Sequence, residues 1–127
     1  MGQAAAKQGD KVTGQCTHTV SNVSTGVTLQ APLPFSGQLT GGLSTSVNIM
    51  GKPAATVGST AANSPAHIPP GGTTFLTPPS NQATVNAGSQ TVNINGKPAA
   101  RANDKALTCT EVPSPGTVVA AGTVMLG

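Results

Sequence analysis

The chain has 127 residues, of which 36% are hydrophobic, with two Phe and no Trp or Tyr, and a net charge of +3 from six basic and three acidic residues. This length suits one domain, whose core must be thin because aromatic rings normally supply much of the buried area. The scattered basic residues exclude the basic stripe that is typical of a nucleic-acid-binding surface. No apolar run is long enough to span a membrane.

The first segment, MGQAAAKQGDK, lacks the apolar core of a secretory signal. We therefore expect the protein to be made in the cytoplasm without a signal peptide. The chain contains two cysteines, Cys16 and Cys109. In the absence of a secretory signal they indicate a metal site or free thiols more than a disulfide.

Two nearly identical decapeptides, SVNIMGKPAA and TVNINGKPAA, begin at Ser46 and Thr91. In each copy Val and Ile alternate with polar residues, as in a half-buried strand. The Gly-Lys-Pro that follows predicts that the strand ends in a turn there, because Pro has no hydrogen-bond donor for a ladder. The turn motif consists of Gly51, Lys52, Pro53, Ala54 and Ala55 in one copy and of Gly96, Lys97, Pro98, Ala99, Ala100 and Arg101 in the other.

The two ends of the chain together supply a third copy. The C-terminal GTVMLG matches the strand half of the repeat, and the N-terminal GQAAAKQGD matches the half after the strand. Lys7 then aligns with Arg101 and Asp10 aligns with Asp104, which predicts a turn-capping role for both Asp residues. A chance similarity between Ala- and Gly-rich ends is the alternative. Three units whose ends join predict an all-β, closed, pseudo-threefold structure with adjacent N- and C-termini.

The repeat also predicts how the single domain, residues 1–127, is divided. The three units cover residues 120–127 plus 1–19, 44–67 and 89–112. The segments 22–43 and 68–88 are rich in Thr, Ser and Pro. We expect them to be loops, which either lie on the surface or dock a cargo protein.

Four side chains that can bind a transition metal follow the Ala-Ala turns of the three units: Cys16, His18, His67 and Cys109. A pseudo-threefold axis brings these segments to one end, and two Cys with two His suit tetrahedral zinc. Four protein ligands leave no open position, so such a site is structural. Two alternatives stay open: a Cys16–Cys109 disulfide, or a surface His18 with Cys109 as a small buried apolar residue. The thin core favours the metal, because it needs a cross-link.

Catalysis has little support in the sequence. No Ser-His-Asp or Cys-His spacing predicts a triad. The acids are Asp10, Asp104 and Glu111, and two of these share a repeat position. We therefore expect that the protein is not an enzyme.

These motifs together resemble those of PAAR-repeat proteins, the spike-tip proteins of type VI secretion systems, contractile phage tails and related contractile injection systems. The resemblance covers nearly the whole chain through the two Gly-Lys-Pro-Ala-Ala copies, Arg101 and the terminal Thr-Val-Met-Leu-Gly. It implies a pointed cone of short β-strands with zinc near the vertex. The base of the cone would sit on a homotrimeric β-helical spike protein.

The resemblance also implies a ligand set, commonly three His and one Cys. His67, in His-Ile-Pro-Pro-Gly-Gly, resembles the family's His before a Pro/Gly loop, and Cys109 resembles the Cys after the Pro-Ala-Ala-Arg turn. This chain has two His, so Cys16 would replace the third. Cys16 and His18 lie later in their unit than the usual His of the family.

The function implied by the resemblance is that of a structural tip, one copy per spike, which caps and sharpens the baseplate spike for puncturing target membranes. Its partners would be the spike, transiently the membrane, and no nucleic acid. Assembly would place it in a secreted, extracellular or virion-like particle. An adaptor that docks an effector protein onto the spike and a small zinc hydrolase are the alternatives.

Overall fold

The computed structural model describes residues 2–64, 66–109 and 114–126, and within these ranges it is built from β-strands without any helix. The predicted all-β class is therefore confirmed, and the described residues contain no helix that could cross a bilayer. The strands are β1 (Gln3–Ala4), β2 (Lys11–Asn22), β3 (Thr28–Gly41), β4 (Asn48–Ile49), β5 (Lys52–Pro53), β6 (Thr60–Asn63), β7 (Thr73–Phe75), β8 (Gln82–Val85), β9 (Asn93–Ile94), β10 (Lys97–Pro98), β11 (Lys105–Thr108), β12 (Ser114–Val119) and β13 (Met125–Leu126).

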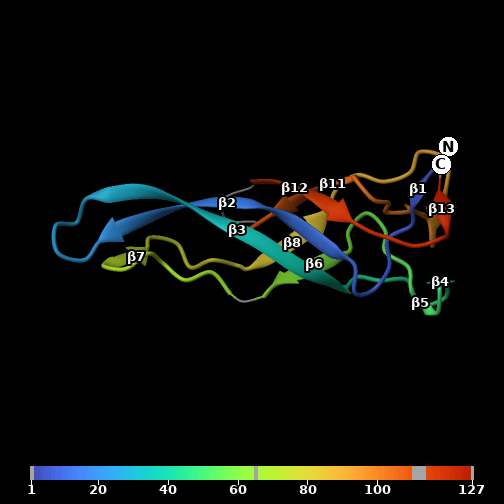
Figure 1. The fold of residues 1–127 in the computed structure, drawn as a ribbon, viewed down its shortest axis with the longest axis horizontal. Coiled ribbons are helices and arrows are strands. Elements are labelled where there is room, and N and C mark those ends of the chain that lie inside the picture. Colours follow the sequence, from blue (N-terminus) through green and yellow to red (C-terminus); the bar gives the residue numbers. More distant parts are fainter. Residues whose placement is uncertain (1, 65, 110–113, 127) are drawn as a thin grey trace.

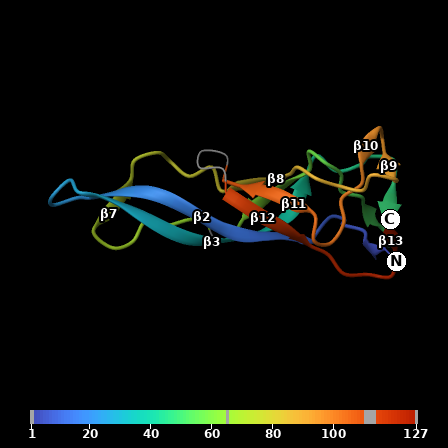
Figure 2. The same ribbon diagram turned by 90° about the horizontal axis from the view of Figure 1, so that it is seen from above.

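The molecule is elongated, with both chain termini at one end and the turn of the β2–β3 hairpin at the other (Figure 1). The end that carries the termini is called the base here, and it consists of the short pairs β1–β13, β4–β5 and β9–β10 (Figure 2). The opposite end, residues 19–30 of the β2–β3 hairpin, is called the tip. The termini are adjacent, as predicted, because β1 pairs with β13.

The base repeats one strand pair three times with the same register. Ile49 stands opposite Lys52, and Ile94 stands opposite Lys97. Leu126 stands opposite Gln3 in the pair that joins the two ends of the chain. The third repeat predicted from the chain ends is therefore present in the structure as a strand pair of its own.

The turn of each base hairpin lies two residues earlier than the sequence suggested. Met50 and Gly51 have left-handed φ angles of 52° and 83°, and Asn95 and Gly96 have 53° and 80°. Each strand therefore ends in a turn that includes the Gly, as expected, but Lys-Pro lies after the turn and forms the returning strand. Pro fits there because it stands opposite Asn in the second pair from the turn, where alternation directs a backbone N–H away from its partner.

Three alanines close the structure around the pseudo-threefold axis. The backbone N–H of Ala6 donates to the carbonyl of Ala100 (2.9 Å), that of Ala100 to Ala55 (3.0 Å), and that of Ala55 to Ala6 (3.0 Å). All three residues are fully buried. The second Ala of each turn is therefore small because three backbones meet there.

The turn after each alanine is capped by a side chain from the same repeat position. The Asp104 carboxylate accepts from the backbone N–H of Arg101 (2.7 Å), and the Asp10 carboxylate accepts from that of Lys7 (3.0 Å). In the second unit the Ser59 hydroxyl accepts from the Thr56 N–H (2.9 Å). The predicted capping role is thus confirmed. The Asp104 carboxylate also hydrogen-bonds to the Arg101 guanidinium and raises its pKa above the ordinary value.

Above the base, six strands form a closed barrel in the order β12-β11-β8-β6-β3-β2, which the β12–β2 pairing completes. The three repeat units supply β2, β6 and β11, and the segments that follow them supply β3, β8 and β12. The segment 68–88, expected to be a loop, contains β7 and the barrel strand β8. The barrel interior is filled by small and medium apolar side chains, namely Val12, Leu39, Ala61, Val85, Ala106 and Val118.

The β2–β3 hairpin continues beyond the barrel, and the expected loop at 22–43 is wrong because Thr28–Gly41 is strand β3. The backbone of Ser36 faces away from β2, since its N–H donates to Asn63 Oδ1 (3.0 Å). Alternation then puts Pro32 and Pro34 on that same open edge, where no donor is needed. The prolines that suggested a loop therefore protect an exposed strand edge.

Candidate metal centre

The long strand β2 supplies two of the four predicted metal ligands. Alternation along β2 places Cys16 and His18 on its inner face, together with Val20. Cys16 is 0% and His18 is 2% exposed, so the alternative of a surface His18 is wrong. Both residues lie past the last β2–β12 pair, at Gly14, which places them between the barrel and the tip.

Cys109 comes from the third unit, directly after β11. Its φ of 56° is left-handed, which is uncommon for a residue other than Gly. Its backbone N–H donates to the carbonyl of Gln82 (2.9 Å), and its side chain is fully buried. The chain therefore turns sharply at the end of β11 and directs the Cys109 sulfur inward.

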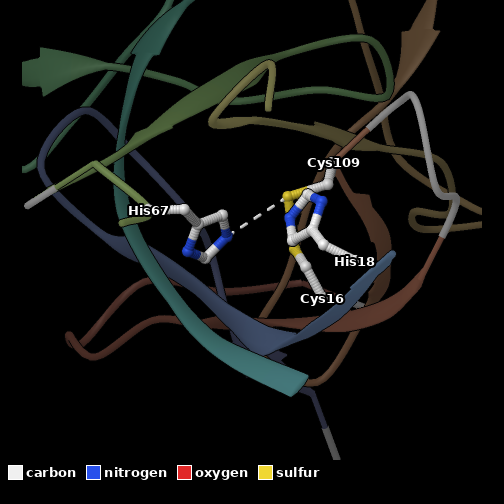
Figure 3. Close-up of side chains that lie close together, drawn as sticks. All are labelled: Cys16, His18, His67 and Cys109. Atoms are coloured by element: carbon white, nitrogen blue, oxygen red, sulfur yellow. Dashed lines mark hydrogen bonds between the residues drawn. A yellow bond between two sulfur atoms is a disulfide. The ribbon is translucent and has the colours of Figure 1, made fainter. Parts of the chain in front are cut away.

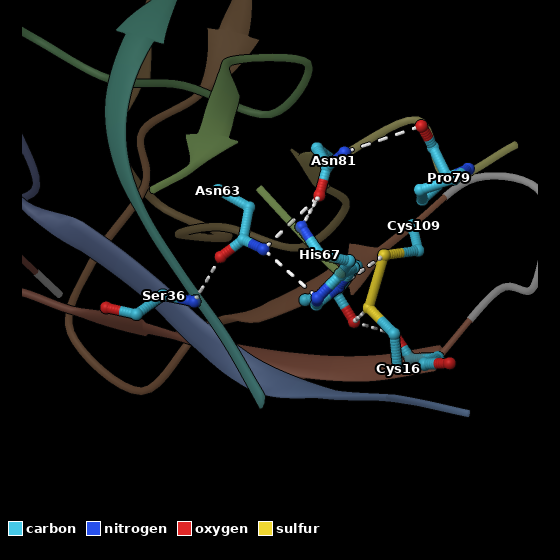
Figure 4. The surroundings of a disulfide bond; sticks show 9 residues. Cys16, Ser36, Asn63, His67, Pro79, Asn81 and Cys109 are labelled. Carbon is cyan, nitrogen blue, oxygen red and sulfur yellow. Dashed lines mark hydrogen bonds between the residues drawn. A yellow bond between two sulfur atoms is a disulfide. The ribbon is translucent and has the colours of Figure 1, made fainter. Parts of the chain in front are cut away.

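His67 comes from the second unit, after β6, and two asparagines hold it in place. Its backbone N–H donates to Asn81 Oδ1 (2.7 Å), and its ring Nδ1 lies 3.2 Å from Asn63 Nδ2. Asn63 is itself held by its bond from the Ser36 backbone. Figure 4 shows this chain of amides beside His67.

The four predicted ligands converge, as the repeat suggested. One donor atom from each of Cys16, His18, His67 and Cys109 lies within 4.8 Å of the other three (Figure 3). The sulfur atoms of Cys16 and Cys109 are joined as a disulfide, with 6.3 Å between the Cα atoms. The structure therefore contains the disulfide that the sequence left as an alternative. His67 Nε2 lies 3.4 Å from Cys109 Sγ.

Aromatic rings complete the surroundings of the two histidines. His18 lies edge-on to His67 and to Phe75, with ring centroids 5.0 and 5.2 Å apart, and Phe35 lies 6.2 Å from His67. Thr108 Oγ1 is 3.4 Å from Cys16 Sγ. Both histidine rings therefore pack against other aromatic rings.

The donor set fits a metal ion once the two sulfurs are reduced. Two thiolates and two imidazoles form a set that is typical of four-coordinate zinc. The ligands come from all three repeat units, so a bound ion would join all three. Zinc would supply a cross-link at this point, and the four residues Cys16, His18, His67 and Cys109 would hold it.

Sequence reasoning missed the residues that position the ligands. Asn63 lies four residues before His67, but nothing in a single sequence distinguishes it from a surface Asn. Asn81 has a left-handed φ of 55°, which only the structure reveals. Glu111, the third acid considered above, lies outside the described residues.

A family model described as the PAAR motif matches residues 77–126. The chain therefore carries a PAAR motif in this segment. The matched segment contains the third repeat unit, including the Gly-Lys-Pro-Ala-Ala-Arg turn, Cys109 and the closing strand β13. No curated protein and no solved structure matches the chain. The PAAR motif implies a spike-tip role in contractile injection systems.

Proposed function

We propose that this PAAR-repeat protein caps and sharpens the homotrimeric β-helical spike of a contractile injection machine, so that the spike can puncture a target membrane. The base carries this proposal. It presents three equivalent strand pairs around one axis, so a single chain offers a threefold partner three similar contacts. One copy per trimer is therefore sufficient.

The composition of the opposite end supports contact with a membrane. No Asp, Glu, Lys or Arg occurs from Val12 to Gly51 or from Pro53 to Gly96. Near the tip, Val23, Val27 and Leu29 are 65%, 56% and 49% exposed. An uncharged end with exposed aliphatic side chains enters a bilayer without burying an unpaired charge.

The proposed zinc cross-link between the barrel and the tip supports a role in which the protein must resist deformation. The apolar side chains of the upper core are mostly Ala and Val, so packing by itself resists deformation weakly. A zinc ion held by Cys16, His18, His67 and Cys109 would tie the three units together at the point where the barrel narrows to a hairpin. Zinc is therefore the structural cofactor in this proposal.

The structure removes the main argument for the alternative function, an adaptor that docks an effector protein onto the spike. It relied on long loops at 22–43 and 68–88, and the first of these is mostly strand β3. The second contributes β8 to the barrel and β7 to the tip. We therefore propose the tip function alone.

The proposal is tested by co-assembly of the chain with the trimeric spike protein of its own machine, followed by native mass spectrometry. We expect one chain per trimer. Met125→Glu, at a 57% exposed position of the base, should weaken the complex at least tenfold. Leu29→Glu, at a 49% exposed position of the tip, is the matched control and should not weaken it. Three chains per trimer, or a loss of binding only for Leu29→Glu, would contradict the proposal.

A further inference from the structure

The two cysteines of the centre can serve in only one of two arrangements at a time. A zinc ligand is a thiolate, and two thiolates on one tetrahedral zinc lie about 3.8 Å apart. Cys16 and Cys109 are bonded to each other in the structure, so their sulfurs are not thiolates. All four donor atoms nevertheless stay within 4.8 Å of one another. The disulfide therefore lies within the same cluster that would hold the metal.

We propose that the centre is a redox-gated cross-link, with a reduced state that holds zinc and an oxidised state that releases it and forms the Cys16–Cys109 disulfide. This inference rests on the proposed zinc centre of the tip. The two states differ in what they join. Zinc ties the first unit through Cys16 and His18, the second through His67, and the third through Cys109. The disulfide ties only the first unit to the third.

The hydrogen bonds of His67 fit the metal-free state. Asn63 Oδ1 accepts from the Ser36 N–H (3.0 Å), which directs the Asn63 amide N–H towards His67 Nδ1 (3.2 Å). A neutral imidazole that accepts at Nδ1 carries its proton on Nε2. That nitrogen lies 3.4 Å from Cys109 Sγ, so the N–H points at the disulfide.

Zinc ligation by His67 Nε2 requires the other tautomer. The proton then sits on Nδ1, where it meets the N–H of Asn63 instead of an acceptor. The Asn63 side chain must turn or withdraw, because its oxygen is held by Ser36. The change of state therefore involves the His67–Asn63 contact as well as the two sulfurs.

Access to the centre is also through His67. The other three ligands are at most 2% exposed, whereas His67 is partly exposed. It lines a groove of about 270 Å³ together with Leu33, Pro34, Asn63 and Ile68. A small oxidant or a zinc ion can therefore reach the cluster from this side without opening of the barrel.

The oxidation step balances with hydrogen peroxide as the oxidant. One thiolate attacks the peroxide, the O–O bond breaks, and a sulfenic acid and a hydroxide form. The second thiolate then attacks the sulfenic sulfur, the S–S bond forms, and a second hydroxide leaves. The two sulfurs lose two electrons in total and the peroxide gains them. Zn²⁺ leaves with its charge unchanged because its two anionic ligands no longer exist.

The test starts from the full chain, reduced and loaded with one equivalent of Zn²⁺. One equivalent of hydrogen peroxide is added, and released zinc is followed with a colorimetric zinc indicator while free thiols are counted. We expect the loss of two thiols and the release of the zinc at the same rate. Retention of zinc after both thiols are lost would overturn the inference.

The matched control is Cys16→His, which keeps four donors around the site but removes the disulfide partner. We expect it to bind zinc and to release it at least tenfold more slowly under the same peroxide. Circular dichroism checks that it folds, and Cys16→Ser, with three donors left, replaces it if it does not. Equal rates of zinc release in the wild type and the control would overturn the gating.

A second readout follows the second unit. Amide hydrogen exchange in the segment that carries His67 should become at least tenfold faster in the oxidised protein than in the zinc-loaded one. Equal exchange in both states would contradict the proposal that oxidation releases the second unit from the cross-link at His67. If the reduced chain binds no zinc at all, the zinc centre fails and this inference fails with it. Co-assembly with the spike reports on the tip function separately.

Discussion

The base and the tip of this protein are built on different principles. In the base, three copies of one strand pair and one capped turn surround a ring of alanines, so that each contact recurs three times. Toward the tip the described residues are no longer threefold: the β2–β3 hairpin continues, and β7, from the segment after the second unit, pairs with β2. The difference shows that symmetry serves the end that would meet a threefold partner, whereas the end that leads has no such constraint.

The largest expected effect comes from breaking the base at its axis. In Ala100→Leu, three added carbons must enter a site where the backbones of three units are hydrogen-bonded to one another. We expect a loss of about 3 kcal/mol or the absence of a cooperative unfolding transition, measured by chemical denaturation. Ala62→Leu, at an exposed position of β6, is the control and should change stability by less than about 0.5 kcal/mol. A tolerated Ala100→Leu would mean that the axis is not closely packed.

A smaller effect on stability is expected from the capped turns. One of the three is capped by Ser59 in place of an Asp. Asp104→Ala removes both the cap and the ion pair with Arg101, and we expect it to lower the free energy of unfolding by about 2 kcal/mol. Asp104→Ser copies the second unit, in which Ser59 caps the turn without a charge, and should cost about 1 kcal/mol. Both losses in the free energy of unfolding would be measured by unfolding in denaturant. Equal losses for the two variants would show that the ion pair, and not the cap, stabilises this turn.

The smallest effect on stability is expected at the tip. The double variant Val23→Ser/Val27→Ser changes two side chains that are mostly exposed, so the free energy of unfolding should change by less than about 0.5 kcal/mol. Vesicle co-sedimentation should nevertheless show about tenfold weaker membrane binding, because these side chains lose their apolar surface. Val119→Ser, at a 51% exposed position on the flank of the barrel, is the control and should leave binding unchanged. Equal binding by all three proteins would mean that the tip does not enter the bilayer.

The repeat was readable from the sequence because its signals are local. Gly and Asn at the turns, Val and Ile at alternate positions and paired alanines recur at a fixed spacing, and each reports on its immediate surroundings. The same kind of local signal gave a wrong prediction for the β2–β3 hairpin. A segment with Pro32 and Pro34 was predicted to be a loop, although an edge strand accepts prolines wherever its N–H groups face outward.

The four ligands were predicted as a set, but their state was not. Counting residues from the alanine turns predicted that Cys16, His18, His67 and Cys109 meet at one end; the structure brings them together, but between the barrel and the tip. The choice between a disulfide and a metal depends on sulfur-to-sulfur contact and on the hydrogen bonds of His67. Those contacts involve Asn63 and Asn81, whose roles depend on how the loop after β6 folds back.

The sequence by itself predicted three units, chain ends that meet, and the convergence of two cysteines and two histidines. Each of these follows from short motifs whose backbone requirements are nearly independent of the rest of the chain. The tertiary structure decided the length of the β2–β3 hairpin, the closure of the barrel by β12 and β2, and the pairing of the sulfurs. These depend on contacts between residues far apart in sequence, because a strand register or a disulfide exists only when both partners are in place.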